Sequence, residues 1–235
     1  MIRNPGRFAG LLYLVGSIPG FFALLYVPRR LFVHGNPTAT AENLVSHETL
    51  FRLGIFADLA AQSFFLLVAF ALYNLLKSVN RHQAQAMFFL LFISISISFL
   101  SELNSIAALY MARGEGSLAT LDHAQRIAWM RLFLNLRGDS LEIAGIFWGL
   151  WLFPLGLLVY RAGFIPRIIG ALLMIGCFAY LANSFASLVF PSAAETVARV
   201  ANPIQLAEMI FMLWLLVMGA TPNVSQGRVT GHAFD

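Results

Sequence analysis

Residues Asp139–Arg167 read DSLEIAGIFWGLWLFPLGLLVYRAGFIPR, and this stretch decides the fold class. No charged residue occurs from Ile143 to Tyr160. About 18 helical residues at 1.5 Å each cover roughly 27 Å, close to the hydrocarbon thickness of a bilayer. The stretch therefore predicts a membrane-spanning helix. Its glycines predict that another helix approaches closely, because packing holds helices together in lipid; they are Gly145, Gly149 and Gly156.

The composition extends this prediction to the whole chain of 235 residues. Hydrophobic residues make up 59% of it and charged residues 11%, against roughly a quarter charged in soluble domains. We expect one transmembrane domain over residues 1–220, followed by a flexible polar tail at 221–235. The net charge of +4 is spread singly or in pairs at the ends of apolar runs, which is typical of membrane topology signals and argues against nucleic-acid binding.

The apolar runs predict an all-α, polytopic transmembrane bundle of about six spans. Short amphipathic helices are expected at the membrane interface in the first-to-second and third-to-fourth loops. Pro19 predicts a kink in the first span, since proline removes a backbone hydrogen bond. The expected spans lie near residues 8–27, 50–76, 84–111, 140–160, 167–190 and 203–219.

The third expected span contains the alternating sequence ISISISF, a pattern that normally indicates a β-strand. A lone strand cannot satisfy its backbone hydrogen bonds in lipid, so we interpret the segment as helix. Helical spacing then gathers serines beside Glu102 in one polar stripe: Ser94, Ser98, Ser101 and Ser105.

An even number of spans places both termini on one side of the membrane. Short loops on that side carry lysine and arginine, whereas the short loop opposite carries only Arg199. The distribution favours a multi-pass protein of the cytoplasmic (inner) membrane with both termini in the cytoplasm. The long third-to-fourth loop, with four arginines, and the pair Arg29 and Arg30 oppose this orientation.

Several stretches of the sequence resemble one family of prokaryotic membrane proteins, the domain-of-unknown-function family 4386. They include GNPTATAENLVSHETLFRLGIFADL from Gly35 and LYNLLKSVNRH from Leu72. The fullest is IFWGLWLFPLGLLVYRAGFIPRIIGALLMIGCFAYLANSF, from Ile146 to Phe185. The resemblance implies a multi-span membrane protein, and it implies no activity and no catalytic residues.

Polar residues within the expected spans are the candidate site. A charge at the centre of a span costs about 2.5–3.5 kcal/mol on insertion scales, so each requires a reason. With the N-terminus inside, these residues share the outer half of the membrane, and we expect a polar pocket between helices that opens away from the cytoplasm. The candidates are Asp58, Gln62, Glu102, Asn104, Arg137, Asp139, Glu142, Asn183 and Glu208.

Two roles are open for these residues. They could pair with Arg52, Arg131 or Arg137 and only hold the bundle together. Alternatively, if Asp58 and Glu102 face each other, they cannot both stay ionised cheaply, so one should hold a proton near neutral pH. The second role would make the pair a binding or coupling site.

The functional hypothesis is therefore binding or transport of a small polar or amphiphilic solute or a proton. An enzyme acting on a lipid-like substrate, with Glu102 or Glu142 as general base, is less favoured because no nucleophile or metal set is evident. A third alternative is a structural or helper subunit of a membrane complex. We expect no cofactor and no metal; membrane lipids are expected partners, a small-molecule ligand is allowed, and homo- or hetero-oligomers are left open.

Overall fold

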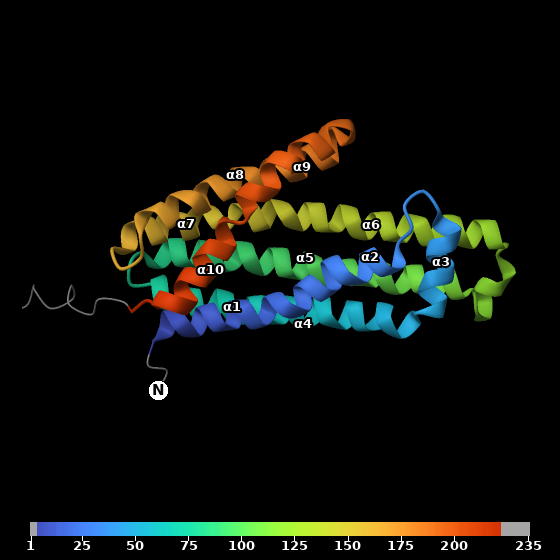
Figure 1. Cartoon of the computed structure of the whole chain (residues 1–235), viewed down its shortest axis with the longest axis horizontal. Coiled ribbons are helices and arrows are strands. Elements are labelled where there is room, and N and C mark those ends of the chain that lie inside the picture. Colours follow the sequence, from blue (N-terminus) through green and yellow to red (C-terminus); the bar gives the residue numbers. More distant parts are fainter. Residues whose placement is uncertain (1–3, 222–235) are drawn as a thin grey trace, which may run out of the picture.

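The computed structural model describes residues 4–221, and every regular element in that part of the chain is helical. Six helical segments there are long and apolar enough to cross a membrane, which confirms the predicted fold class. Figure 1 shows the segments running side by side. The α-helices are α1 (Pro5–Phe21), α2 (Val27–Leu31), α3 (Pro37–Ser46), α4 (Glu48–Leu76), α5 (Arg81–Arg113), α6 (His123–Leu150), α7 (Leu152–Ala162), α8 (Arg167–Val189), α9 (Pro191–Gln205) and α10 (Ala207–Met218).

The first span is interrupted between α1 and α2. A π-helical turn, Phe22–Tyr26, joins the two helices. Pro19 lies within the last turn of α1 and cannot donate a backbone hydrogen bond. The widened turn that follows is the kind of local irregularity found where a helix lines a functional site.

The fourth span differs from its prediction. The segment expected as a separate interfacial helix continues directly into the span, so that His123–Ala162 is one segment of 40 residues. Its start is fixed by Asp122, whose Oδ1 accepts from Gln125 N at 2.8 Å while Gln125 Oε1 accepts from Asp122 N at 3.2 Å. The segment is irregular at Trp151, where α6 gives way to α7. Backbone hydrogen bonds still run from Trp151 N to Phe147 O and from Leu155 N to Trp151 O, and Pro154 in the same turn cannot donate.

The sixth span is also longer than predicted. Residues 191–202, expected as a polar loop, form most of α9, which begins at Pro191 immediately after α8 ends. Proline is favoured at the first turn of a helix because its missing N–H is not needed there. α9 and α10 are separated at Leu206, just after Pro203.

The predicted glycine contacts are confirmed between the fourth and fifth spans. A Cβ at Gly156 would lie 2.6 Å from the carbonyl oxygen of Gly170, and a Cβ at Gly145 would lie 2.6 Å from Ser184 Oγ. In the same way, a Cβ at Gly149 would lie 2.9 Å from the Cβ of Tyr180. α6 and α7 therefore pack directly on α8, and any larger side chain at these positions would separate them.

The serine stripe and the chain ends also agree with the sequence. α5 is a continuous helix, and Ser94, Ser98, Ser101 and Ser105 are all buried along it. Gly6 N donates to Ala220 O at 2.9 Å, so both ends of the described chain lie at one end of the bundle (Figure 1). Six spans require this arrangement.

Candidate functional site

One cavity lies inside the bundle where three spans are interrupted. Its volume is about 330 Å³. The lining includes Phe21 beside the π-helical turn, Trp151 at the break between α6 and α7, and Glu208 just after the break between α9 and α10. Breaks in helices that cross lipid are tolerated where the freed backbone faces protein or a cavity. The three interruptions and the cavity thus form one structural feature.

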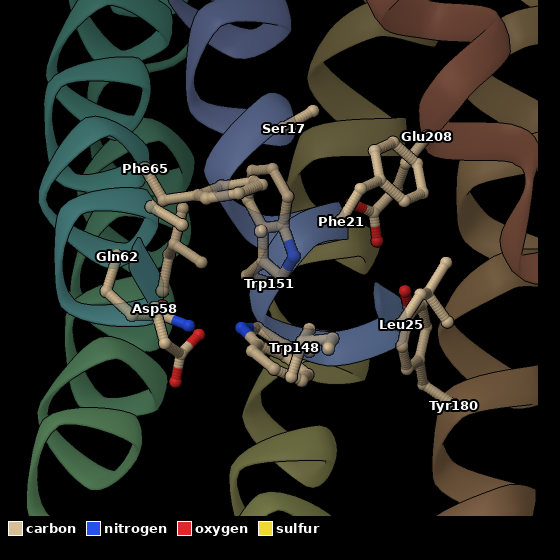
Figure 2. Close-up of a pocket in the computed structure, with 14 residues that line it drawn as sticks. Ser17, Phe21, Leu25, Asp58, Gln62, Phe65, Trp148, Trp151, Tyr180 and Glu208 are labelled. Carbon is tan, nitrogen blue, oxygen red and sulfur yellow. The ribbon is translucent and has the colours of Figure 1, made fainter. Parts of the chain in front are cut away.

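Asp58 and Gln62 on α4 form one polar side of this cavity (Figure 2). Their spacing of four residues places them on one face of the helix. Asp58 is 1% exposed and Gln62 4%. Within residues 4–221, neither oxygen of Asp58 has a hydrogen-bond partner, and neither does Gln62 Oε1. These buried acceptors line open space with their hydrogen-bonding capacity unused.

Arg137 on α6 connects Asp58 to Glu102 on α5. Its Nη2 lies 2.8 Å from Glu102 Oε1, and its Nε donates to the same oxygen at 3.0 Å. The Asp58 carboxylate lies farther away, with Oδ2 3.8 Å from Nη2. One cation is thus shared by two buried acids, and its hydrogen bond goes to Glu102.

A small second cavity adjoins this ion cluster. It measures about 20 Å³ and is lined by Glu102, Ser105 and Arg137 together with apolar residues of the first and second spans. A space of this size holds one water molecule when polar groups surround it. Asp58 thus lines the larger cavity, and Glu102 and Arg137 line the smaller one.

Glu208 on α10 lies on the other side of the large cavity (Figure 2). The hydroxyl of Tyr13 on α1 donates to Glu208 Oε2 at 2.6 Å. Tyr180 on α8 lines the cavity on the same side. Because a hydroxyl already satisfies Glu208 in part, this carboxylate differs from Asp58, which lacks such a donor.

Aromatic rings occupy the space between the two carboxylates. Trp148 and Trp151 lie between Asp58 and Glu208 in Figure 2, and Phe65 lies above them. Trp151 is fully buried, and the cavity otherwise has mainly apolar walls. The geometry can hold a small molecule that has an apolar body and a polar end.

The rim of the cavity is apolar and exposed. Phe21, Leu24 and Leu25 are 52%, 39% and 45% exposed, and all three line the cavity. Exposed apolar side chains in the middle of a membrane span contact lipid. The cavity therefore has an edge that adjoins the bilayer interior.

The remaining predicted site residues lie outside this cavity. Asn183 Nδ2 donates to Glu142 Oε2 at 3.5 Å, which links α8 to α6. Asn104 is half-buried on α5, and Asp139 is exposed on α6. Of the predicted arginine partners, Arg137 pairs with the candidate acids Glu102 and Asp58, whereas Arg52 pairs with Glu48 at 2.7 Å.

Sequence reasoning missed Tyr13, Trp148 and Trp151 as site residues. Each lies in an apolar run where an aromatic residue is unremarkable, and only the folded chain brings them together. Across residues 4–221, no group of three or more His, Cys, Asp or Glu side chains is arranged to hold a metal ion.

Comparisons with known proteins place the chain among proteins without an assigned activity. The profile of a family described as "Domain of unknown function (DUF4386)" matches residues 8–219. A protein of Archaeoglobus fulgidus described as "Uncharacterized protein" is 26% identical over 154 residues, which cover 65% of this chain and 75% of the relative. No solved structure matches.

Proposed function

Because this chain belongs to the DUF4386 family, whose description assigns no activity, we propose its function from the geometry of the site: it binds a small amphiphilic solute within the membrane and carries that solute across. The observation behind this proposal is the cavity of about 330 Å³, with unpartnered acceptors on one side and Glu208 on the other. Pockets for small molecules commonly measure about 300–1,000 Å³ and combine apolar walls with a few polar groups.

Transport is favoured over static binding by the interrupted spans. The π-helical turn, the break at Trp151 and the break at Leu206 all adjoin the cavity. Membrane transporters commonly place the substrate beside discontinuous helices near the middle of the bilayer, where the segments can move relative to one another. We place the termini in the cytoplasm. Asp58 then lies in the outer half of the membrane, because it is nearer the Glu48 end of α4, whereas Glu208, hydrogen-bonded by Tyr13 near the start of α1, lies nearer the cytoplasmic end, contrary to the expectation from the sequence.

The binding step can be tested with 2-(4-bromophenyl)ethanol, a neutral amphiphile whose bromine quenches tryptophan fluorescence. The full chain in detergent carries four tryptophans. Trp148 and Trp151 are at the cavity, and Trp129 is exposed near the far end of α6. We expect saturable quenching that persists in Trp129→Phe, because the bound probe lies against Trp148 and Trp151.

The controls separate the cavity from the detergent micelle. Trp148→Phe keeps an aromatic wall and should reduce the saturable signal. Leu25→Trp at the rim should weaken binding, whereas Leu53→Trp, at an exposed leucine of α4 that does not line the cavity, should not. Quenching that rises linearly with probe, or that disappears in Trp129→Phe, would show partition into detergent and overturn the proposal.

A further inference from the structure

We infer that the solute is an amphiphilic organic cation, an amine with an apolar body, whose ammonium group binds between Asp58 and Gln62. The inference rests on the proposed function and specifies its ligand class. It follows from three features of the cavity: its charge balance, its unused hydrogen-bond acceptors and its aromatic walls.

The charge balance near Asp58 is negative. Asp58 on α4 and Glu102 on α5 share Arg137, whose hydrogen bond and shorter ion-pair contact both go to Glu102. Asp58 is left 3.8 Å from the guanidinium, beyond hydrogen-bond distance, and is 1% exposed. A buried carboxylate that has only this long ion pair and no hydrogen bond is costly, so this position favours a bound cation over an anion or a neutral group.

The unused acceptors match the donors of an ammonium group. Asp58 Oδ1 and Oδ2 and Gln62 Oε1 lack hydrogen-bond partners among residues 4–221, and both side chains line the cavity. A primary ammonium has three N–H donors and no acceptor, as in lysine. A carboxylic acid ligand would instead bring its negative charge against Asp58.

The walls require an organic rather than an inorganic cation. Trp148 and Trp151 lie beside Asp58 (Figure 2), and Phe65 and Leu91 complete an apolar lining. Indole faces attract cations and also accommodate apolar groups. A metal ion would find few oxygen ligands here, whereas an aryl or alkyl amine would use both the charge and the walls.

The same walls suggest the route of entry. An amphiphilic amine partitions into the bilayer, and the exposed rim of Phe21, Leu24 and Leu25 adjoins the lipid. The ligand can thus enter sideways with its apolar body leading. Glu208, hydrogen-bonded by Tyr13, then lies at the opposite side of the cavity.

The test compares three probes of similar shape on the full chain in detergent: 2-(4-bromophenyl)ethylamine, 2-(4-bromophenyl)ethanol and 3-(4-bromophenyl)propanoate. The readout is saturable quenching of Trp148 and Trp151 near neutral pH. We expect the amine to bind about tenfold or more tightly than the alcohol, because a charge-assisted hydrogen bond is stronger than a neutral one. The propanoate should bind most weakly.

Asp58→Asn then removes the charge while preserving shape, and Arg137 keeps its contacts with Glu102. The variant should lose the preference for the amine and retain alcohol binding. If wild type binds the alcohol as tightly as the amine, the inference fails and the proposed function stands. If none of the probes quenches saturably, the proposed function itself fails. The comparison of amine with alcohol binding to the wild-type chain tests the inference even if Asp58→Asn does not fold.

Discussion

Arg137 holds Glu102 through one oxygen, with Nη2 at 2.8 Å and Nε at 3.0 Å from Oε1. This contact joins α6 to α5. The same Nη2 also lies 3.8 Å from Asp58 Oδ2, which connects α6 to α4. Three spans are therefore linked through one partly buried cation. The linkage is structural on the Glu102 side, and it leaves Asp58 available to the cavity.

Replacing Arg137 by Leu should destabilise the bundle by about 3–5 kcal/mol, because two buried carboxylates lose their cation. The measurement is thermal unfolding in detergent. Arg52→Leu is the control: its partly exposed pair with Glu48 should be worth less than about 1 kcal/mol. Equal losses for the two variants would contradict the assigned role of Arg137.

Glu102→Gln should cost less than Arg137→Leu. The arginine keeps Asp58 as a partner 3.8 Å away, and the amide oxygen can still accept one hydrogen bond. The same thermal unfolding series measures this difference. A loss in Glu102→Gln as large as in Arg137→Leu would show that Asp58 cannot take over, and that the cluster depends on the Glu102 pair alone.

Tyr13→Phe should destabilise the chain by about 1.5–3 kcal/mol if Glu208 is charged, because the variant removes its hydroxyl donor. The hydrogen bond is 2.6 Å long, and Tyr13 is 4% exposed. Tyr26→Phe, at a tyrosine exposed on the π-helical turn, is the matched control. Unfolding temperatures that fall equally in both variants would count against a specific link between α1 and α10.

Much of this fold could be predicted from the sequence. The number of spans follows from apolar length, and the contact of α6 and α7 with α8 follows from Gly145, Gly149 and Gly156. The ends of helices were predicted less well. α6 begins at His123 and α9 at Pro191, because helix continues through residues that are too polar for a hydropathy criterion but are well capped or begin with proline.

The candidate site was predictable only in part. Asp58 and Glu102 are conspicuous in apolar helices, and the structure places Arg137 next to both. Tyr13 and Trp148 give no such signal, since aromatic residues are common in membrane spans. Their positions depend on contacts between helices distant in sequence, such as the pair of α1 and α10, which local patterns do not encode.

The orientation predicts which loops an impermeant maleimide reaches on intact cells. Ser192→Cys, in the first turn of α9, should be labelled, whereas Ser78→Cys, between α4 and α5, should not. Both serines are exposed, and the native Cys177 is buried and serves as background. Labelling of Ser78→Cys alone would place the termini outside, and labelling of both would contradict the six-span topology.

Amine binding should strengthen from about pH 5 to about pH 8, because protons and the ammonium group compete for Asp58. Titration of tryptophan quenching by 2-(4-bromophenyl)ethylamine at several pH values measures the effect. Asp58→Asn is the control, and its binding of the amine should not change over this pH range. Binding that weakens over this range would contradict the role of Asp58. The charged and titratable groups around the two cavities are Asp58, Glu102, Arg137, Glu208, Tyr13 and Tyr180.

The central claim is that a ligand occupies the cavity between the interrupted spans, and photolabelling tests it most directly. A phenylethylamine that carries a diazirine on its ring would be activated with the full chain in detergent, and the adducts would be mapped by mass spectrometry. The account predicts saturable adducts on Phe21, Leu25, Trp148 and Tyr180, which line the cavity, and their loss under excess unlabelled amine. Adducts confined to outward-facing residues such as Phe56 and Ile168, which are 70% and 67% exposed, would contradict it.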